Sequence, residues 1–235
     1  MHILLTHEQA DFDAIASLLG AHLLEVEAIA VLPRKLNRNV RAFLTLYGAE
    51  LPFTDPVDLP KGNIEGITLV DTQSLITIKG MMKKTKINVI DHHEVRSDLS
   101  KEWHLNIEKT GAATTLLVEG IQERDLPLTM VQATLLLLGI YEDTGALTYS
   151  RTVSRDARAA AYLLEKGASL QIARDFLNHP LSPEQQEIYS QLKDSIETHS
   201  IQGSDILLAT GDAGESTEEI SSIVHKLRDL LDPDA

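Results

Sequence analysis

Short apolar runs alternate with segments of helical periodicity over the first hundred residues. The runs predict buried β-strands at 2–6, 28–32, 67–70 and 86–90. Apolar residues recur at helical spacing in 13–24 and 37–47, which follow the first two runs. Strands that alternate with helices indicate right-handed crossovers. We therefore expect an α/β fold with a mainly parallel sheet, flanked by helices and covered on both faces.

The pattern becomes helical from residue 111 onward. Four segments have helical periodicity, at 111–123, 129–141, 154–166 and 169–178. Ser154 has the chemistry of an N-cap, and Gly167 stands where the third of these helices is expected to end.

A breaker sequence, Asn-His-Pro-Leu-Ser-Pro at 178–183, predicts a domain boundary. Beyond it, the pattern predicts a helix at 182–196 with Pro183 in its first turn, a strand at 205–209 and an amphipathic helix at 217–231. One strand and one helix do not close a core on their own. We therefore expect three parts: a first domain at 1–180, a connecting helix at 181–197, and the incomplete beginning of a second α/β domain at 198–235.

Composition narrows the class of protein. Apolar residues make up 43% of the 235 residues, and there is no cysteine, which excludes disulfides and thiolate sites. The longest apolar run, 135–141, is far shorter than the roughly 20 residues of a membrane span. We expect a cytoplasmic protein without membrane contact. A net charge of −14 disfavours long nucleic acids as ligands of this chain, because a diffuse negative field repels polyanions.

Four polar clusters interrupt the apolar runs. They are His7 with Asp11 and Asp13, Asp71, the triplet Asp91-His92-His93, and Asp143-Thr144-Gly145. The first three clusters follow predicted strands directly. Ligands of open α/β sheets bind beyond the carboxyl ends of the strands, so these side chains are expected to meet at one edge of the sheet. Asp143 is placed to reach that edge from the end of its helix.

Two divalent cations would allow such a cluster to exist. Carboxylates at close range repel one another, and burial increases the cost. A mixed set of aspartates and histidines without thiolates suits Mn²⁺ best, with Mg²⁺, Co²⁺ or Zn²⁺ as alternatives. Asp71 stands alone between the other clusters and is the natural bridge between the two cations.

Structural alternatives remain open for single members of the cluster. Asp11 or Asp13 could be the N-cap of the first helix. Asp71 could begin a turn, and Asp143-Thr144-Gly145 could simply end a helix. Asp91-His92-His93 is harder to explain structurally, because two histidines and a carboxylate after a buried strand have little purpose in packing.

The four motifs together resemble the DHH phosphoesterases, which are named for the Asp-His-His triplet. The resemblance covers residues 1–180 and keeps the family's motif order. It implies that His7, Asp11 and Asp71 hold one cation and that Asp13, Asp71, His92 and Asp143 hold the second. It also implies that Asp91 orients the ligand histidine His92, that His93 approaches the substrate phosphate or a ligand site, and that Gly111 and Thr114 face the substrate.

The resemblance implies hydrolysis of phosphoester bonds by a hydroxide that the two cations share. Short oligonucleotides or small nucleotides fit the acidic chain better than long polymers. Arg96 and Arg151 are candidates for holding the phosphate, and solvated surface is the alternative for each.

Other functions remain open. The family's second domain usually carries a Gly-Gly-Gly-His signature, and this chain contains no Gly-Gly pair. Its organisation is similar to the first part of fusions that join a DHH module to CBS domains and a tRNA nucleotidyltransferase or poly(A) polymerase. The chain could therefore be a regulatory or nucleotide-binding module with little activity of its own, or an inorganic pyrophosphatase. A homodimer is compatible with the sequence.

Overall fold

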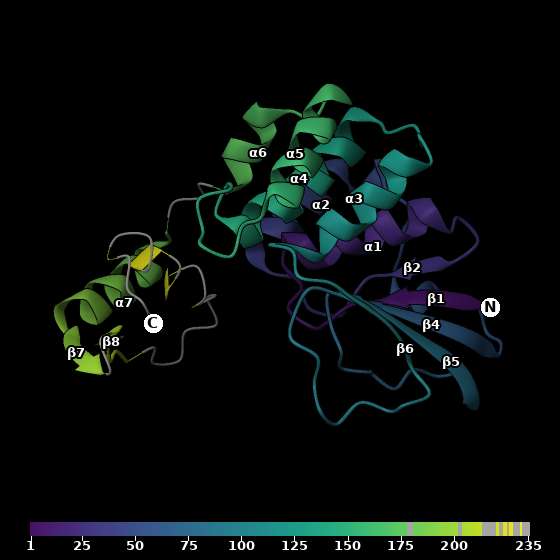
Figure 1. The fold of residues 1–235 in the computed structure, drawn as a ribbon, viewed down its shortest axis with the longest axis horizontal. Helices are drawn as coiled ribbons and strands as arrows, with labels where there is room; N and C mark the ends of the chain where they lie inside the picture. The colour runs from purple at the N-terminus through teal and green to yellow at the C-terminus, as the bar shows by residue number, and fades with distance from the viewer. Residues whose placement is uncertain are drawn as a thin grey trace. The chain divides into compact units, whose positions relative to one another are not determined.

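The computed structural model describes residues 1–177, 181–201 and 204–212, together with positions 220, 223, 224, 226, 227 and 231. The chain divides into two compact units, Met1–Asn178 and His179–Ala235 (Figure 1). Each unit is described by itself.

A six-stranded parallel sheet forms the centre of the first unit. Its strand order is β3-β2-β1-β4-β5-β6. The strands are β1 (His2–Leu5), β2 (Ile29–Val31), β3 (Phe53–Thr54), β4 (Ile64–Val70), β5 (Met81–Asp91) and β6 (His104–Ile107). The four predicted strands and the α/β class are confirmed. The edge strands β3 and β6 were not predicted, because the first has only two residues and the second is mostly exposed.

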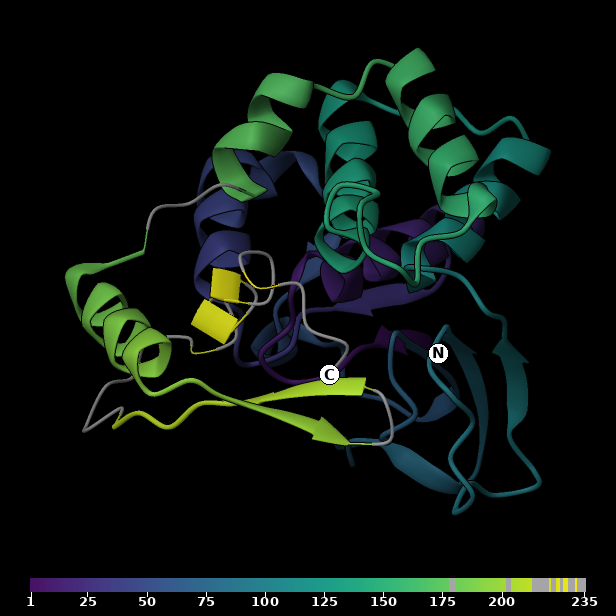
Figure 2. The same cartoon turned by 60° about the vertical axis from the view of Figure 1, so that its left-hand side comes forward.

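The helices of this unit lie on one side of the sheet, as Figures 1 and 2 show. They are α1 (Phe12–Leu24), α2 (Arg38–Tyr47), α3 (Ala113–Glu123), α4 (Met130–Thr144), α5 (Ser154–Glu165) and α6 (Leu170–Leu177). Their apolar side chains share one large core with Leu4, Ala30 and Val70 of the sheet. The 3₁₀ turns Gly48–Glu50 and Pro56–Asp58 flank β3.

The opposite face of the sheet is covered by loops. Ile3, Ile67 and Val89 point into a second core, against which Leu75 and Trp103 of the connecting loops pack. In the described residues, no α-helix lies between β3 and β4, β4 and β5, or β5 and β6. The cover expected on both faces is therefore helical on one face only. None of the described helices is long and apolar enough to cross a membrane.

Two helix ends differ from their predicted form. Ser154 is the first residue of α5, and Val153 occupies the N-cap, so the N-cap prediction for Ser154 is wrong. At this helix end, the Asp156 carboxylate accepts a hydrogen bond from the backbone N–H of the N-cap residue Val153 at 2.8 Å. Gly167 follows the end of α5 with a φ of +94°, as expected of a residue that ends a helix. α4 continues to Thr144, which places Asp143 in its last turn.

Gly139 allows α1 and α4 to cross closely. A Cβ atom at this position would lie 2.6 Å from the Cβ of Ala16 and 2.7 Å from the Oγ1 of Thr114. Gly139→Ala is expected to lower the free energy of unfolding by about 1–3 kcal/mol, because a packed interface must move apart. Urea denaturation measures this loss. Gly48→Ala is the control, since its nearest contact would be an ordinary 3.7 Å. Equal stability of the two variants would contradict the prediction.

The second unit contains α7 (Pro183–Asp194) and an antiparallel pair, β7 (Glu197–Ile201) and β8 (Ser204–Leu208). Ser182 caps α7, and Pro183 is in its first turn, as the sequence predicted for the connecting helix. The strand predicted at 205–209 is observed as β8, and β7 was not predicted. Most of the helix predicted at 217–231 lies outside the described residues. That this unit begins a larger second domain stays a prediction.

Candidate metal centre

Three neighbouring strands bring the predicted polar clusters to one edge of the sheet. β1, β4 and β5 are adjacent, and the segments that begin at His7, Asp71 and Asp91 lie at or just beyond their carboxyl ends. Asp143 reaches this edge from α4. Potential ligand atoms lie within 4.8 Å of one another in three groups of described residues: His7, Asp11 and Asp71; Asp13, His92 and Asp143; Asp71, Asp91, His92 and His93.

Asp71 lies between two halves of this cluster. Its Oδ2 is 3.4 Å from His7 Nε2, and its Oδ1 is 3.5 Å from His92 Nε2. The residue is 5% exposed and has a φ of +53°. Aspartate and asparagine tolerate this left-handed conformation better than most residues. The two oxygens of this buried carboxylate therefore face different histidines.

The first half of the cluster consists of His7, Asp11 and Asp71. His7 Nδ1 lies 2.9 Å from the carbonyl oxygen of Glu8, which turns Nε2 toward the two aspartates. The Oδ1 of Asp11 is 4.0 Å from this Nε2 and accepts a hydrogen bond from Ala14 N at 3.0 Å. Asp11 therefore caps α1, as the structural alternative proposed, and also faces the cluster.

The second half consists of Asp13, His92 and Asp143. Asp13 is fully buried, and its two oxygens accept hydrogen bonds from the backbone N–H groups of Ala113 and Thr114 at 2.7 and 2.9 Å. His92 Nε2 lies 3.8 Å from Asp13 Oδ2 and 3.4 Å from Asp143 Oδ2. The turn that begins α3 thus holds a carboxylate whose charge faces His92.

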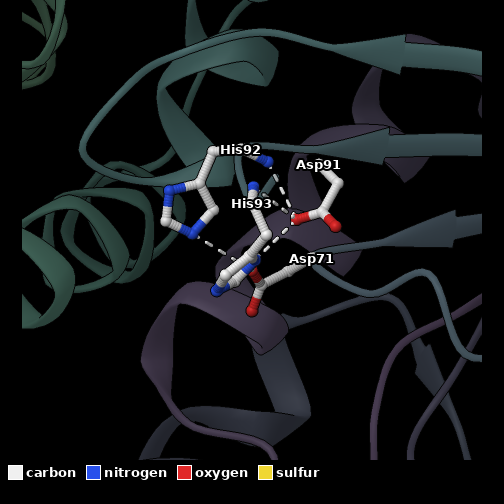
Figure 3. A group of neighbouring side chains, drawn as sticks. All are labelled: Asp71, Asp91, His92 and His93. Carbon is white, nitrogen blue, oxygen red and sulfur yellow. Dashed lines mark hydrogen bonds and ion pairs between the residues drawn. The ribbon is translucent and has the colours of Figure 1, made fainter. Parts of the chain in front are cut away.

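The two histidines of the triplet are oriented by different partners. His92 Nδ1 lies 3.2 Å from the carbonyl oxygen of Thr110. The Oδ1 of Asp91 accepts hydrogen bonds from His93 Nδ1 at 2.8 Å and from the backbone N–H of His92 at 2.8 Å (Figure 3). The expectation that Asp91 orients the ligand histidine His92 is therefore corrected, because the ring that it holds is His93. The His93 side chain is 53% exposed.

The donor set fits divalent cations. Asp71 Oδ1 and His92 Nε2 are buried and have no hydrogen-bond partner among the described residues. Carboxylate oxygens and imidazole nitrogens lie about 2.0–2.2 Å from a cation such as Zn²⁺, so two of them on one cation lie about 3–3.5 Å apart. The separations around Asp71 are of this size. A cation between these atoms would satisfy both orphaned groups.

The pKa values of Asp11, His7 and His92 are raised, which indicates that the carboxylates of the cluster require nearby positive charge. Burial, together with Asp71 and Asp143, raises the pKa of Asp11 to about 7. The contact with Asp71 raises the pKa of His7 to about 9. Burial lowers the pKa of His92, but Asp143 and Asp71 outweigh it and raise the pKa to about 11. In the absence of cations, protons must supply the charge that opposes these carboxylates.

The four residues predicted to bind substrate lie in different surroundings. Thr114 is fully buried and supports Asp13, and the N–H of the buried Gly111 donates to Asp156. The Arg96 guanidinium pairs with both carboxylate oxygens of Asp98. Arg151 is exposed and makes no contact with the cluster in the described part of the chain. Their role toward substrate stays a prediction.

Two residues that support the cluster through hydrogen bonds were not predicted from the sequence. Gln73 is buried, and its Nε2 donates to Asp91 Oδ2 at 2.8 Å while its Oε1 accepts from the backbone N–H of Arg96 at 2.9 Å. Asp156 is fully buried and accepts hydrogen bonds from Gly111 N and from Thr115 Oγ1. The one feature of the sequence that could have indicated Gln73 is its place two residues after Asp71. Asp156 lies in an ordinary helical pattern, which gives no indication of its role.

Comparison with known proteins agrees with this geometry. Residues 2–140 match the N-terminal domain of the DHH family. All of the chain aligns at 33% identity with 27% of the A-adding tRNA nucleotidyltransferase of Geobacter sulfurreducens. With a second relative, the bifunctional oligoribonuclease and PAP phosphatase NrnA of Mycoplasma genitalium, 61% of the chain aligns at 28% identity with 45% of that protein.

The fold recurs in a solved structure as well. An exopolyphosphatase-related protein from Bacteroides fragilis superposes with a TM-score of 0.63 at 17% identity, covering 84% of this chain and 62% of that one. The chain spans about a quarter of the Geobacter enzyme and less than half of the Mycoplasma enzyme. Because the family's N-terminal domain matches more than half of the residues of this chain, the chain belongs to the DHH family.

Proposed function

We propose that this chain hydrolyses phosphoester bonds of short oligonucleotides or small nucleotides with the help of two divalent cations, of which Mn²⁺ is the preferred ion. The observation that carries the proposal is the position of Asp71, which directs one oxygen toward His7 and the other toward His92. One buried carboxylate between two sets of ligands is the arrangement that a pair of cations requires. The similarity to a bifunctional oligoribonuclease and PAP phosphatase supports the choice of substrate class.

Each group of side chains has a distinct task in this proposal. His7, Asp11 and Asp71 hold one cation, and Asp13, Asp71, His92 and Asp143 hold the other. Bound cations supply a water of lowered pKa and neutralise charge that develops on the phosphoryl oxygens.

His93 and Asp91 act beside the cations. Asp91 accepts a hydrogen bond from Nδ1 of the half-exposed His93 ring and raises the pKa of this histidine. In the protonated ring, Nε2 is the nitrogen left to donate a hydrogen bond to a phosphoryl oxygen. His93 is the proposed catalytic residue that touches the substrate, and Asp91 is its positioning residue.

A second candidate is a nucleotide-binding or regulatory module within a larger tRNA nucleotidyltransferase. The alignment of the whole chain with 27% of an A-adding enzyme favours this alternative. Hydrolysis and regulation are separable by measurement, because only the first requires turnover by this chain.

An activity panel tests the proposal. The chain is assayed with Mn²⁺ on a short RNA, on 3′-phosphoadenosine 5′-phosphate and on pyrophosphate, beside Asp91→Ala. Hydrolysis of the RNA or the nucleotide that depends on Mn²⁺ and falls in the variant is the expected result. Binding of Mn²⁺ without turnover of any substrate would favour the regulatory module. Hydrolysis of pyrophosphate alone would replace the proposed substrate class.

Gln73→Leu is expected to lower kcat about tenfold, because Asp91 loses the donor that fixes its second oxygen and His93 loses its fixed orientation. The binding of Mn²⁺ should change little, because Gln73 does not directly face the two half-sites. These are the two halves of the cluster, His7 with Asp11 and Asp71, and Asp13 with His92 and Asp143. Steady-state kinetics and a Mn²⁺ titration measure the two effects. Gln122→Leu, on the exposed side of α3, is the matched control. Wild-type kcat in the Gln73 variant would refute the positioning role.

A further inference from the structure

A basic segment follows β2 in a chain that is otherwise strongly acidic. Residues 34–41, Arg-Lys-Leu-Asn-Arg-Asn-Val-Arg, contain four cationic side chains and no acidic one, whereas the whole chain has 35 acidic and 21 basic residues. The segment runs from the carboxyl end of β2 into the first turns of α2. It therefore begins at the same edge of the sheet as the candidate metal centre, because β2 is parallel to the adjacent β1.

Backbone hydrogen bonds fasten this segment to the loop that carries His7 and Asp11. Lys35 N donates to Glu8 Oε2 at 3.0 Å, and Ala10 N donates to the carbonyl oxygen of Lys35 at 3.3 Å. Asn37 N donates to the carbonyl oxygen of Ala10 at 3.0 Å. Glu8 and Ala10 both lie between His7 and Asp11 in the sequence. The position of Lys35 relative to the first half of the cluster is therefore fixed by the fold.

Four residues of this junction, Glu8, Gln9, Arg34 and Lys35, line an open hollow of about 460 Å³. Its volume lies within the common range of small-ligand sites. Arg34 and Lys35 are exposed and form no ion pair among the described residues. Two cations and one carboxylate give the hollow a net charge of +1. That charge complements a phosphodiester, which carries one negative charge, better than it complements pyrophosphate.

We propose that Arg34 and Lys35 bind the phosphodiester group next to the one that is hydrolysed. The inference rests on the proposed function and narrows its substrate class to single-stranded oligonucleotides. Arginine and lysine are the usual partners of phosphate oxygens in proteins. The strongly acidic remainder of the chain limits such binding to short strands, because it repels phosphates further along.

The experiment compares a pentanucleotide RNA with bis(p-nitrophenyl) phosphate, a phosphodiester too small to occupy both sites. The double variant Arg34→Ala/Lys35→Ala is expected to raise KM for the pentanucleotide about tenfold. Its kcat/KM for the small diester should stay within about twofold of the wild type, because the metal centre is untouched. An unchanged KM for the pentanucleotide, or an equal loss for both substrates, would overturn the proposal.

Lys83→Ala/Lys84→Ala is the matched control. These exposed lysines stand near the amino end of β5, about 23–26 Å along the strand from Asp91. Both double variants change the net charge by the same amount, from −14 to −16. The control is expected to leave both substrates unaffected, so that a general effect of charge can be told from a local one.

A binding measurement separates failure of this inference from failure of the proposed function. If the wild-type chain hydrolyses neither of these two substrates nor 3′-phosphoadenosine 5′-phosphate, the proposed function fails, and polarisation of a fluorescent pentanucleotide then tests the site alone. The Arg34/Lys35 variant should bind about tenfold more weakly. It should also lose about 1.4 from the slope of log Kd against log salt, at about 0.7 for each contact with a single strand. No binding by the wild type, or equal Kd values in both double variants, overturns the inference.

Discussion

Asp71→Asn is expected to lower kcat by about a thousandfold or more, because the variant loses the charge shared between the two half-sites. Asparagine suits this test for two reasons. It matches the shape of aspartate, and it is among the few residues that tolerate the φ of +53° at this position. The fold should therefore persist while the bridge is lost. Steady-state kinetics and a Mn²⁺ titration of the same preparation measure both consequences.

The Mn²⁺ stoichiometry of this variant is expected to fall from two to one or fewer. Asp125→Asn is the control, because Asp125 has a similar φ of +46°, is exposed and pairs with Lys166 on the surface. A variant at position 71 that keeps wild-type kcat and two bound ions would show that Asp71 is not a bridge. An unfolded Asp71 variant is recognised by circular dichroism, and Asp71→Glu then offers a second variant that keeps the charge but displaces it.

Asp156→Ala is expected to lower the free energy of unfolding by about 3–5 kcal/mol. The fully buried Asp156 carboxylate accepts hydrogen bonds from Gly111 N, Thr115 Oγ1 and Val153 N. Its removal leaves two buried donors and the partly buried N–H of Val153 without their acceptor, and each buried group costs about 1–3 kcal/mol. Denaturant unfolding measures the loss. Asp175→Ala, an exposed aspartate on α6, is the control and should be nearly neutral.

The same substitution is expected to weaken one half of the metal centre. Thr110 orients His92, and the N–H groups of Ala113 and Thr114 hold Asp13, so the turn fixed by Asp156 supports two of the proposed ligands of the second half-site. Asp156→Asn keeps the side-chain shape and allows the effect on Mn²⁺ binding to be measured in a folded protein. Unfolding of Asp156→Ala at the same denaturant concentration as Asp175→Ala would contradict the role of Asp156.

The convergence of His7, Asp71 and the Asp91-His92-His93 triplet could be predicted from the sequence. Each stands at the end of an apolar run, and the carboxyl ends of parallel strands meet at one edge of a sheet. The place of Asp143 was also predictable, because its helix ends beside that edge. The expectation of bound cations came from the chemistry of these residues, because four carboxylates can lie close together only with added positive charge.

The partners of individual side chains could not be predicted in the same way. Asp91 and Thr110 are both buried near the two histidines, and only the turn of the chain decides that His93 faces Asp91 and His92 faces Thr110. Gln73 and Asp156 act through contacts with residues that are 18 and 45 positions away. Local patterns carry no signal for such contacts. The strands β3 and β6 were missed because two residues, or four mostly exposed ones, leave no periodicity to detect.

The most direct test of the central claim is the number and position of ions bound around Asp71. Crystals of this chain grown with Mn²⁺ would show the ions by anomalous scattering. The account predicts two peaks about 3.5–4 Å apart, with one carboxylate oxygen of Asp71 on each. One peak should lie beside His7 and Asp11, and the other beside Asp13, His92 and Asp143. A single peak, or two peaks that Asp71 does not join, would contradict it.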